Sequence, residues 1–60
     1  MSRDWAEAPF MDYLEAVDNL LEDGGHAMTV QAELTEVAAA QEAGFGPEEC
    51  VEDILTLRGE

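Results

Sequence analysis

The sequence predicts an all-α fold, a compact bundle of three (to five) short helices with a strongly acidic surface. In three segments, apolar residues recur at steps of three and four, the spacing that places side chains on one face of a helix. Glycines separate these segments, and we find no alternating apolar and polar run typical of a strand. We therefore expect residues 1–60 to form a single small helical domain.

The first predicted helix runs from about Pro9 to Glu22. Proline suits the first helical turn, and the pair Gly24 and Gly25 ends the helix. The predicted apolar stripe consists of Phe10, Tyr13, Leu14, Val17, Leu20 and Leu21. Almost opposite this stripe lies a predicted acidic ridge formed by Asp12, Glu15, Asp18 and Glu22.

The second predicted helix runs from about Val30 to Ala43, with Thr29 as its N-cap and Gly44 just beyond its C-terminal end. Its predicted inner stripe is thin and consists of Val30, Leu34, Val37, Ala38 and Gln41. The acids that lie off this stripe are Glu33, Glu36 and Glu42.

The third predicted helix begins at Gly46-Pro47-Glu48-Glu49 and ends at Gly59. Its first turn carries two carboxylates, which the helix dipole favours at that end. The predicted inward residues are Cys50, Val51, Ile54, Leu55 and Leu57. The predicted outward residues are Glu48, Glu49, Glu52 and Asp53.

The charge of the chain is its most unusual property. Fifteen residues are Asp or Glu and only two are basic, which gives a formal net charge of -13. Such a charge opposes compaction, so we expect it to serve binding to a basic partner. A folded chain of this size exposes about 3,800 Å², or about one carboxylate per 250 Å², whereas duplex DNA carries about one phosphate per 110 Å². Acids crowded onto about half of the surface would match DNA.

Residues that could carry other chemistry are few. Cys50 has no second cysteine and His26 no second histidine, which excludes an internal disulfide and a zinc site of the usual spacing. Asp23 to His26 lacks the ligand pattern of a calcium loop and is predicted to be a helix C-terminal turn. We expect no catalytic residue, cofactor or metal, and therefore no enzyme. The sequence has no apolar run long enough to span a membrane, and we expect the protein to lie in the cytoplasm. We also expect a monomer.

Two resemblances bear on function. The string Ala43-Gly44-Phe45-Gly46 and the helix after it resemble the Met-Gly-Phe loop of ubiquitin-associated domains, with Ala43 in place of the methionine. The chain from Trp5 through the Pro47 helix resembles small acidic phage-encoded anti-CRISPR proteins, most nearly the type I-C inhibitors. That resemblance implies a DNA mimic in the bacterial host cell. It would bind no nucleic acid itself, but would occupy the PAM-reading surface of a type I surveillance complex, on its large subunit.

The acids expected to contact such a basic DNA-binding protein surface are Asp12, Glu15, Asp18, Glu22, Glu33, Glu36, Glu48, Glu49, Glu52 and Asp53. Two other interpretations remain open. The chain could be an acidic adaptor that binds a partner helix through an apolar groove, with its charge serving solubility. It could also come from an extreme halophile, in which case the charge would reflect the solvent alone.

Overall fold

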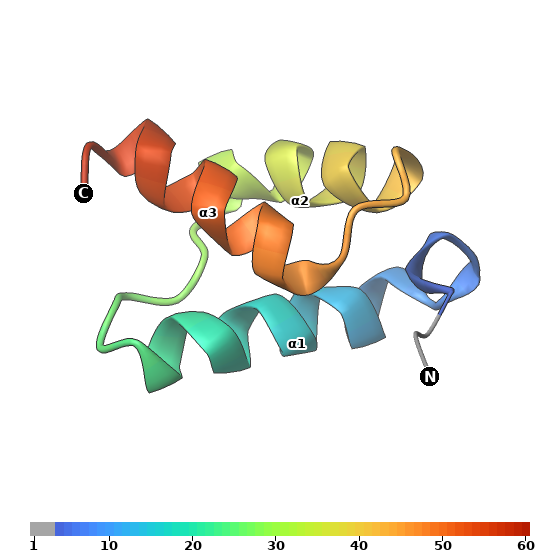
Figure 1. Ribbon diagram of the computed structural model, residues 1–60, viewed down its shortest axis with the longest axis horizontal. Coiled ribbons are helices and arrows are strands. Elements are labelled where there is room, and N and C mark those ends of the chain that lie inside the picture. The colour runs from blue at the N-terminus through green and yellow to red at the C-terminus, as the bar shows by residue number, and fades with distance from the viewer. Residues whose placement is uncertain (1–3) are drawn as a thin grey trace.

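The computed structural model describes residues 4–60, and in these residues the chain forms two layers of helix (Figure 1). Helix α1 (Phe10–Asp23) makes one layer, and α2 (Leu34–Glu42) and α3 (Pro47–Arg58) make the other. Two 3₁₀ turns, η1 (Trp5–Glu7) and η2 (Gln31–Glu33), precede α1 and α2. No strand occurs among these residues, so the predicted all-α bundle is confirmed.

The helices end in one recurring arrangement of backbone hydrogen bonds. After α1, the N–H of Gly25 donates to Glu22 O at 3.0 Å and that of His26 to Leu21 O at 2.8 Å. The same pair of bonds closes α2, where Gly44 has a φ of 85°. Glycine adopts this left-handed conformation without steric penalty. The prediction that Asp23 to His26 is a helix C-terminal turn is confirmed.

The start of α2 differs from the prediction. The structure has a 3₁₀ turn first, so the α-helix begins at Leu34 rather than near Val30. Thr29 is not the N-cap, because its N–H and hydroxyl both donate to Asp18 Oδ1, at 3.0 and 2.8 Å. Glu33 takes over the capping role by accepting the Val30 N–H at 3.1 Å.

The core lies between the two layers and consists of Tyr13, Val17, Leu21, Val37, Ala40, Cys50 and Ile54. Four predicted core positions are wrong, because their residues are exposed: Phe10, Val30, Ala38 and Leu57. Val30 lies before the first turn of helix, and Ala40 takes the inner place that the prediction gave to Ala38. In the last turn of α3, the half-buried residue is Arg58 instead of Leu57.

Hydrogen bonds from two buried side chains, Tyr13 and Gln41, hold the connecting segments against this core. The Tyr13 hydroxyl donates to Phe45 O at 2.7 Å, and its ring meets Trp5 edge to face at 5.7 Å between centroids. Gln41, which is 8% exposed, donates from Nε2 to Trp5 O at 2.9 Å and Ala8 O at 2.6 Å. These contacts fix η1 and the turn between α2 and α3, and so set where the acidic faces of the helices point.

Candidate partner-binding surface

The densest group of acids lies on α3. Its members, called the α3 quartet here, are all exposed: Glu48, Glu49, Glu52 and Asp53. They lie opposite the buried Cys50 and Ile54, as the helical period predicts. A rise of 1.5 Å per residue places all four within about 7.5 Å along the helix axis. The quartet is therefore a compact negative patch on the outside of the bundle.

The acidic face of α1 is formed in the same way. Asp12, Glu15 and Glu22 are exposed on the side away from the buried Tyr13 and Val17. Asp18 was predicted to belong to this ridge, but it is half-buried and accepts both hydrogen bonds from Thr29. The outward ridge of α1 therefore consists of Asp12, Glu15 and Glu22, and Asp18 holds the following loop against the helix.

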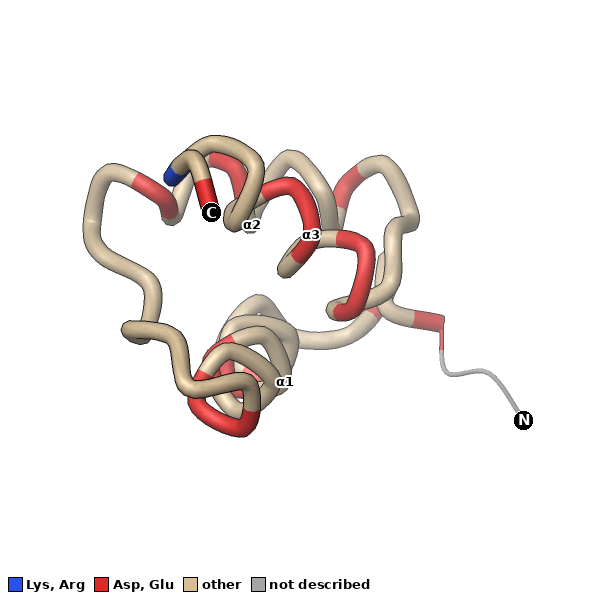
Figure 2. Tube along the Cα trace, turned by 60° about the vertical axis from the view of Figure 1, so that its left-hand side comes forward, with Lys and Arg blue, Asp and Glu red and all other residues tan. Residues whose placement is uncertain are grey.

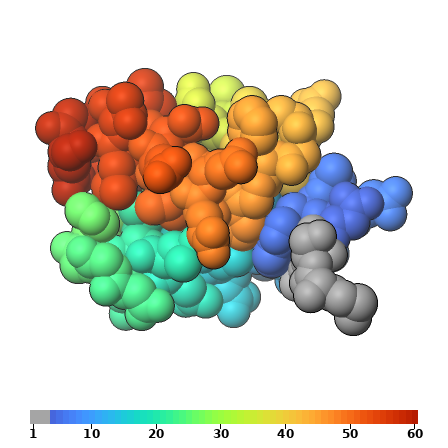
Figure 3. All heavy atoms as spheres, in the orientation of Figure 1, coloured from blue at the N-terminus to red at the C-terminus, as the bar shows by residue number. Residues whose placement is uncertain are grey.

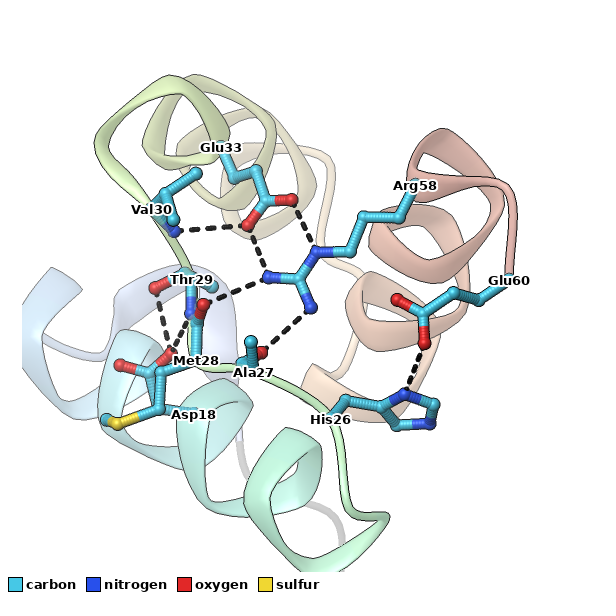
Figure 4. A network of polar contacts seen from close by, with 9 residues as sticks. All are labelled: Asp18, His26, Ala27, Met28, Thr29, Val30, Glu33, Arg58 and Glu60. Carbon is cyan, nitrogen blue, oxygen red and sulfur yellow. Dashed lines mark hydrogen bonds and ion pairs between the residues drawn. The ribbon is translucent and has the colours of Figure 1, made fainter.

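Of the two predicted acids near the start of α2, only Glu36 is exposed. Glu33 is bound by Arg58, whose Nε donates to Oε2 and whose Nη2 donates to Oε1, both at 2.7 Å (Figure 4). The two side chains are only 13% and 16% exposed, respectively. These hydrogen bonds from Arg58 lower the pKa of the Glu33 carboxyl, and the Val30 N–H adds to the effect. Glu33 and Arg58 therefore form a structural ion pair, and Glu33 is not part of the exposed acidic surface.

Arg58 also holds the loop that joins α1 to η2. Its Nη1 donates to Ala27 O at 2.8 Å and its Nη2 to Met28 O at 3.0 Å. Figure 3 shows the loop, in green, packed beneath the end of α3. The sequence prediction did not include this cluster. The sequence does contain a signal for it. Arg58 is the one Lys or Arg from residue 4 onward, so among so many acids it could be expected to pair with one of them.

The engagement of Arg58 has an electrostatic consequence for the surface. Figure 2 shows acidic segments on all three helices, whereas the blue of Lys and Arg appears only at the end of α3. Since that cation already faces Glu33, it does not neutralise the α3 quartet or the α1 ridge. The α3 quartet, and Glu15 and Glu22 of the α1 ridge, are therefore exposed to a cationic partner.

The ion pair predicts a pH dependence of stability. The lowered pKa of Glu33 means that the contact stabilises the fold fully above the unfolded-state pKa of about 4.3. That contribution is lost as the pH falls through the lower folded-state value.

We expect Glu33→Gln to lower the melting temperature clearly at pH 7 and only slightly at pH 3, as measured by circular dichroism. Glu36→Gln, at an exposed acid, is the control. An equal loss for Glu33→Gln at both pH values would contradict this role.

The single thiol is shielded from reaction. Cys50 is 1% exposed, and burial raises the pKa of its thiol to about 11. Burial likewise raises the pKa of the neighbouring Tyr13 phenol, with Cys50, Glu49 and Asp53 adding to the effect. Cys50 therefore lies in the core as predicted, beside a tyrosine that stays neutral.

We expect Cys50 to resist iodoacetamide at pH 8 in the folded protein and to react at the rate of a free thiol once urea unfolds the chain. Mass spectrometry of timed samples measures both rates. Rapid modification of the native protein would show that the thiol is accessible and would contradict a purely structural role.

No metal centre is apparent in the part of the chain that the structure describes, where no three His, Cys, Asp or Glu side chains come together suitably. The His26 ring contacts Glu60 instead, with 2.8 Å between Nδ1 and Oε1. None of the helices within residues 4–60 has the length and apolar character needed to cross a membrane.

Comparisons with family models, with curated proteins and with solved structures found no match to this chain. The geometry and charge of the surface are therefore the basis on which a function is proposed.

Proposed function

We propose that the protein is a non-catalytic inhibitor that presents phosphate-like negative charge to the DNA-binding surface of a basic protein. The observation that supports this proposal is the exposure of the α3 quartet and the α1 ridge, with Arg58 occupied by Glu33. Because carboxylates and phosphates attract the same lysine and arginine side chains, such a surface competes directly with DNA.

The average charge density of the surface is lower than that of duplex DNA, and the acids are unevenly spread. Fifteen carboxylates on 4106 Å² average about one per 270 Å², against about one per 110 Å² for duplex DNA. The four acids of the quartet lie within about two turns of one helix, so the local density is above that average.

The resemblance to type I-C anti-CRISPR proteins indicates which target to test first. It implies that the partner is the PAM-reading DNA surface of a type I surveillance complex, on the large subunit. A protein that acts by occupying this surface needs neither a catalytic group nor a cofactor, and it needs to bind no nucleic acid itself.

A salt-graded pull-down tests the proposal. The chain is immobilised, exposed to bacterial lysate or to the purified type I-C complex, and washed at about 50 to 500 mM salt. We expect DNA-binding proteins to be retained at low salt, and to be released both by high salt and by excess duplex DNA. Capture that survives high salt and is unaffected by DNA would contradict charge mimicry.

The acidic adaptor is a second candidate, favoured by apolar side chains on the surface. Three large apolar side chains lie outside the core: Met11, Met28 and Val30 are 78%, 52% and 56% exposed. Exposed apolar side chains that lie together can mark a site for a protein partner. In this case a partner helix would bind mainly by apolar contact. Its retention in the same pull-down would be largely independent of salt, which separates the two candidates.

A further inference from the structure

A hollow lies on the surface of α1, on the side that faces the loop before η2. Its volume is about 230 Å³. The residues that line it come from the helix and the loop: Met11, Leu14, Glu15, Asp18, Asn19 and Met28. Apolar and acidic side chains therefore meet in one depression, a combination with more specificity than a flat acidic patch.

Half of the residues that line the hollow are apolar: Met11, Leu14 and Met28. Leu14 is half-buried and packs against the core, so the floor is continuous with the interior. Met11 from the helix and Met28 from the loop are 78% and 52% exposed. Thioether side chains adapt to the shape of an occupant, which suits them to binding a long, flexible side chain.

The loop wall is held in place by contacts already described. Met28 O accepts a hydrogen bond from Arg58 Nη2 at 3.0 Å, and the next residue, Thr29, is bound to Asp18. Figure 4 draws the Met28 side chain beside Asp18, and both residues line the hollow. These hydrogen bonds hold the backbone of the loop beside α1.

Two carboxylates determine what this hollow can hold. Glu15 is exposed and Asp18 is half-buried, and both hydrogen bonds from Thr29 end on Asp18 Oδ1. A wholly apolar occupant would remove water from these carboxylates without replacing its hydrogen bonds, which is unfavourable. A side chain with an apolar stem and a cationic head would satisfy the walls and the carboxylates together.

We propose that the hollow binds an arginine side chain on the surface of the basic partner, a proposal that rests on the proposed function. The alkyl stem lies between Met11 and Met28, and the guanidinium donates to the carboxylates of Glu15 and Asp18. Arginine suits this position better than lysine, because its planar fork of donors matches carboxylate geometry and its head is more weakly hydrated.

The probes are a glycine-serine peptide with spaced arginines and two matched peptides, in which lysine or leucine replaces each arginine. Methyl signals of ¹³C-methionine report on Met11 and Met28 during titration. We expect the arginine peptide to shift both signals and to bind at least about threefold more tightly than the lysine peptide. Unmoved signals, equal binding of the lysine peptide, or tighter binding of the leucine peptide would each overturn the inference.

Variants separate this inference from the proposed function. The double change Met11→Gln and Met28→Gln keeps the charge, and we expect it to weaken arginine-peptide binding about fivefold. Leu57→Gln, at an exposed apolar residue outside the hollow, is the matched control and should change binding by less than about twofold. If the double variant binds the peptide normally, the arginine site is wrong. The proposed function still stands in that case if excess DNA releases the captured partner.

Discussion

Reversing the α3 quartet to lysine is expected to abolish binding to the basic partner, with an affinity loss of at least about a hundredfold. Four carboxylates that attract the partner become four cations that repel it, and like charges in an interface are strongly unfavourable. Single changes such as Glu52→Gln should be nearly silent, because one exposed ion pair contributes little. Fluorescence anisotropy measures the affinity, and circular dichroism checks that the helices remain.

The matched control reverses four exposed acids outside the predicted contact set: Asp4, Glu7, Asp23 and Glu42. Its net charge equals that of the quartet variant, so the two differ only in where the charges lie. We expect this control to lose less than about tenfold in affinity. Equal losses in both variants would mean that only net charge matters. That result would contradict a shaped binding surface on α3.

Truncating Ile54 to alanine is expected to cost about 2 to 5 kcal/mol of unfolding free energy. Ile54 is fully buried in the only core that residues 4–60 form, and a domain of this size has little stability to lose. Much of the variant should therefore be unfolded at room temperature.

Leu57→Ala on the same helix is the control for the core truncation, since Leu57 is 63% exposed. Its change should stay within about 0.5 kcal/mol, as for most surface substitutions. Urea unfolding followed by circular dichroism measures both variants. Similar unfolding midpoints for the two would contradict the assignment of Ile54 to the core and of Leu57 to the surface.

The helices were predictable from the sequence because their signals are local. Pro9 and Pro47 lie at helix starts, and Gly25, Gly44 and Gly59 follow the ends, where positive φ is needed. The three-and-four spacing also correctly placed most of the core, including Tyr13 and Ile54.

The errors arise where tertiary contacts override local preference. Thr29 is a good N-cap by type, but Asp18, eleven residues earlier, takes both of its donors. The 3₁₀ turn that follows delays the start of the α-helix to Leu34, so Val30 lies before the first helical turn and is exposed. Neither effect is visible in a local window of sequence.

The candidate surface was predictable to a similar extent. The exposed α3 quartet, the α1 ridge and Glu36 follow from helical phase alone. The pairing of Glu33 with Arg58 spans 25 residues and depends on how α3 packs against the start of α2. The hollow beside Met28 depends on the loop path that this pairing fixes, so it could not be predicted from the sequence.

Competition with DNA for a single binding surface tests the proposed mimicry most directly. A labelled PAM-containing duplex is bound to the purified type I-C surveillance complex, or to the partner recovered in the pull-down, and the chain is added in increasing amounts. We expect the duplex to be displaced in proportion to occupancy by the chain, with the α3 quartet variant inactive. Binding of the chain and the duplex to the same complex at once, seen as a ternary species, would contradict DNA mimicry.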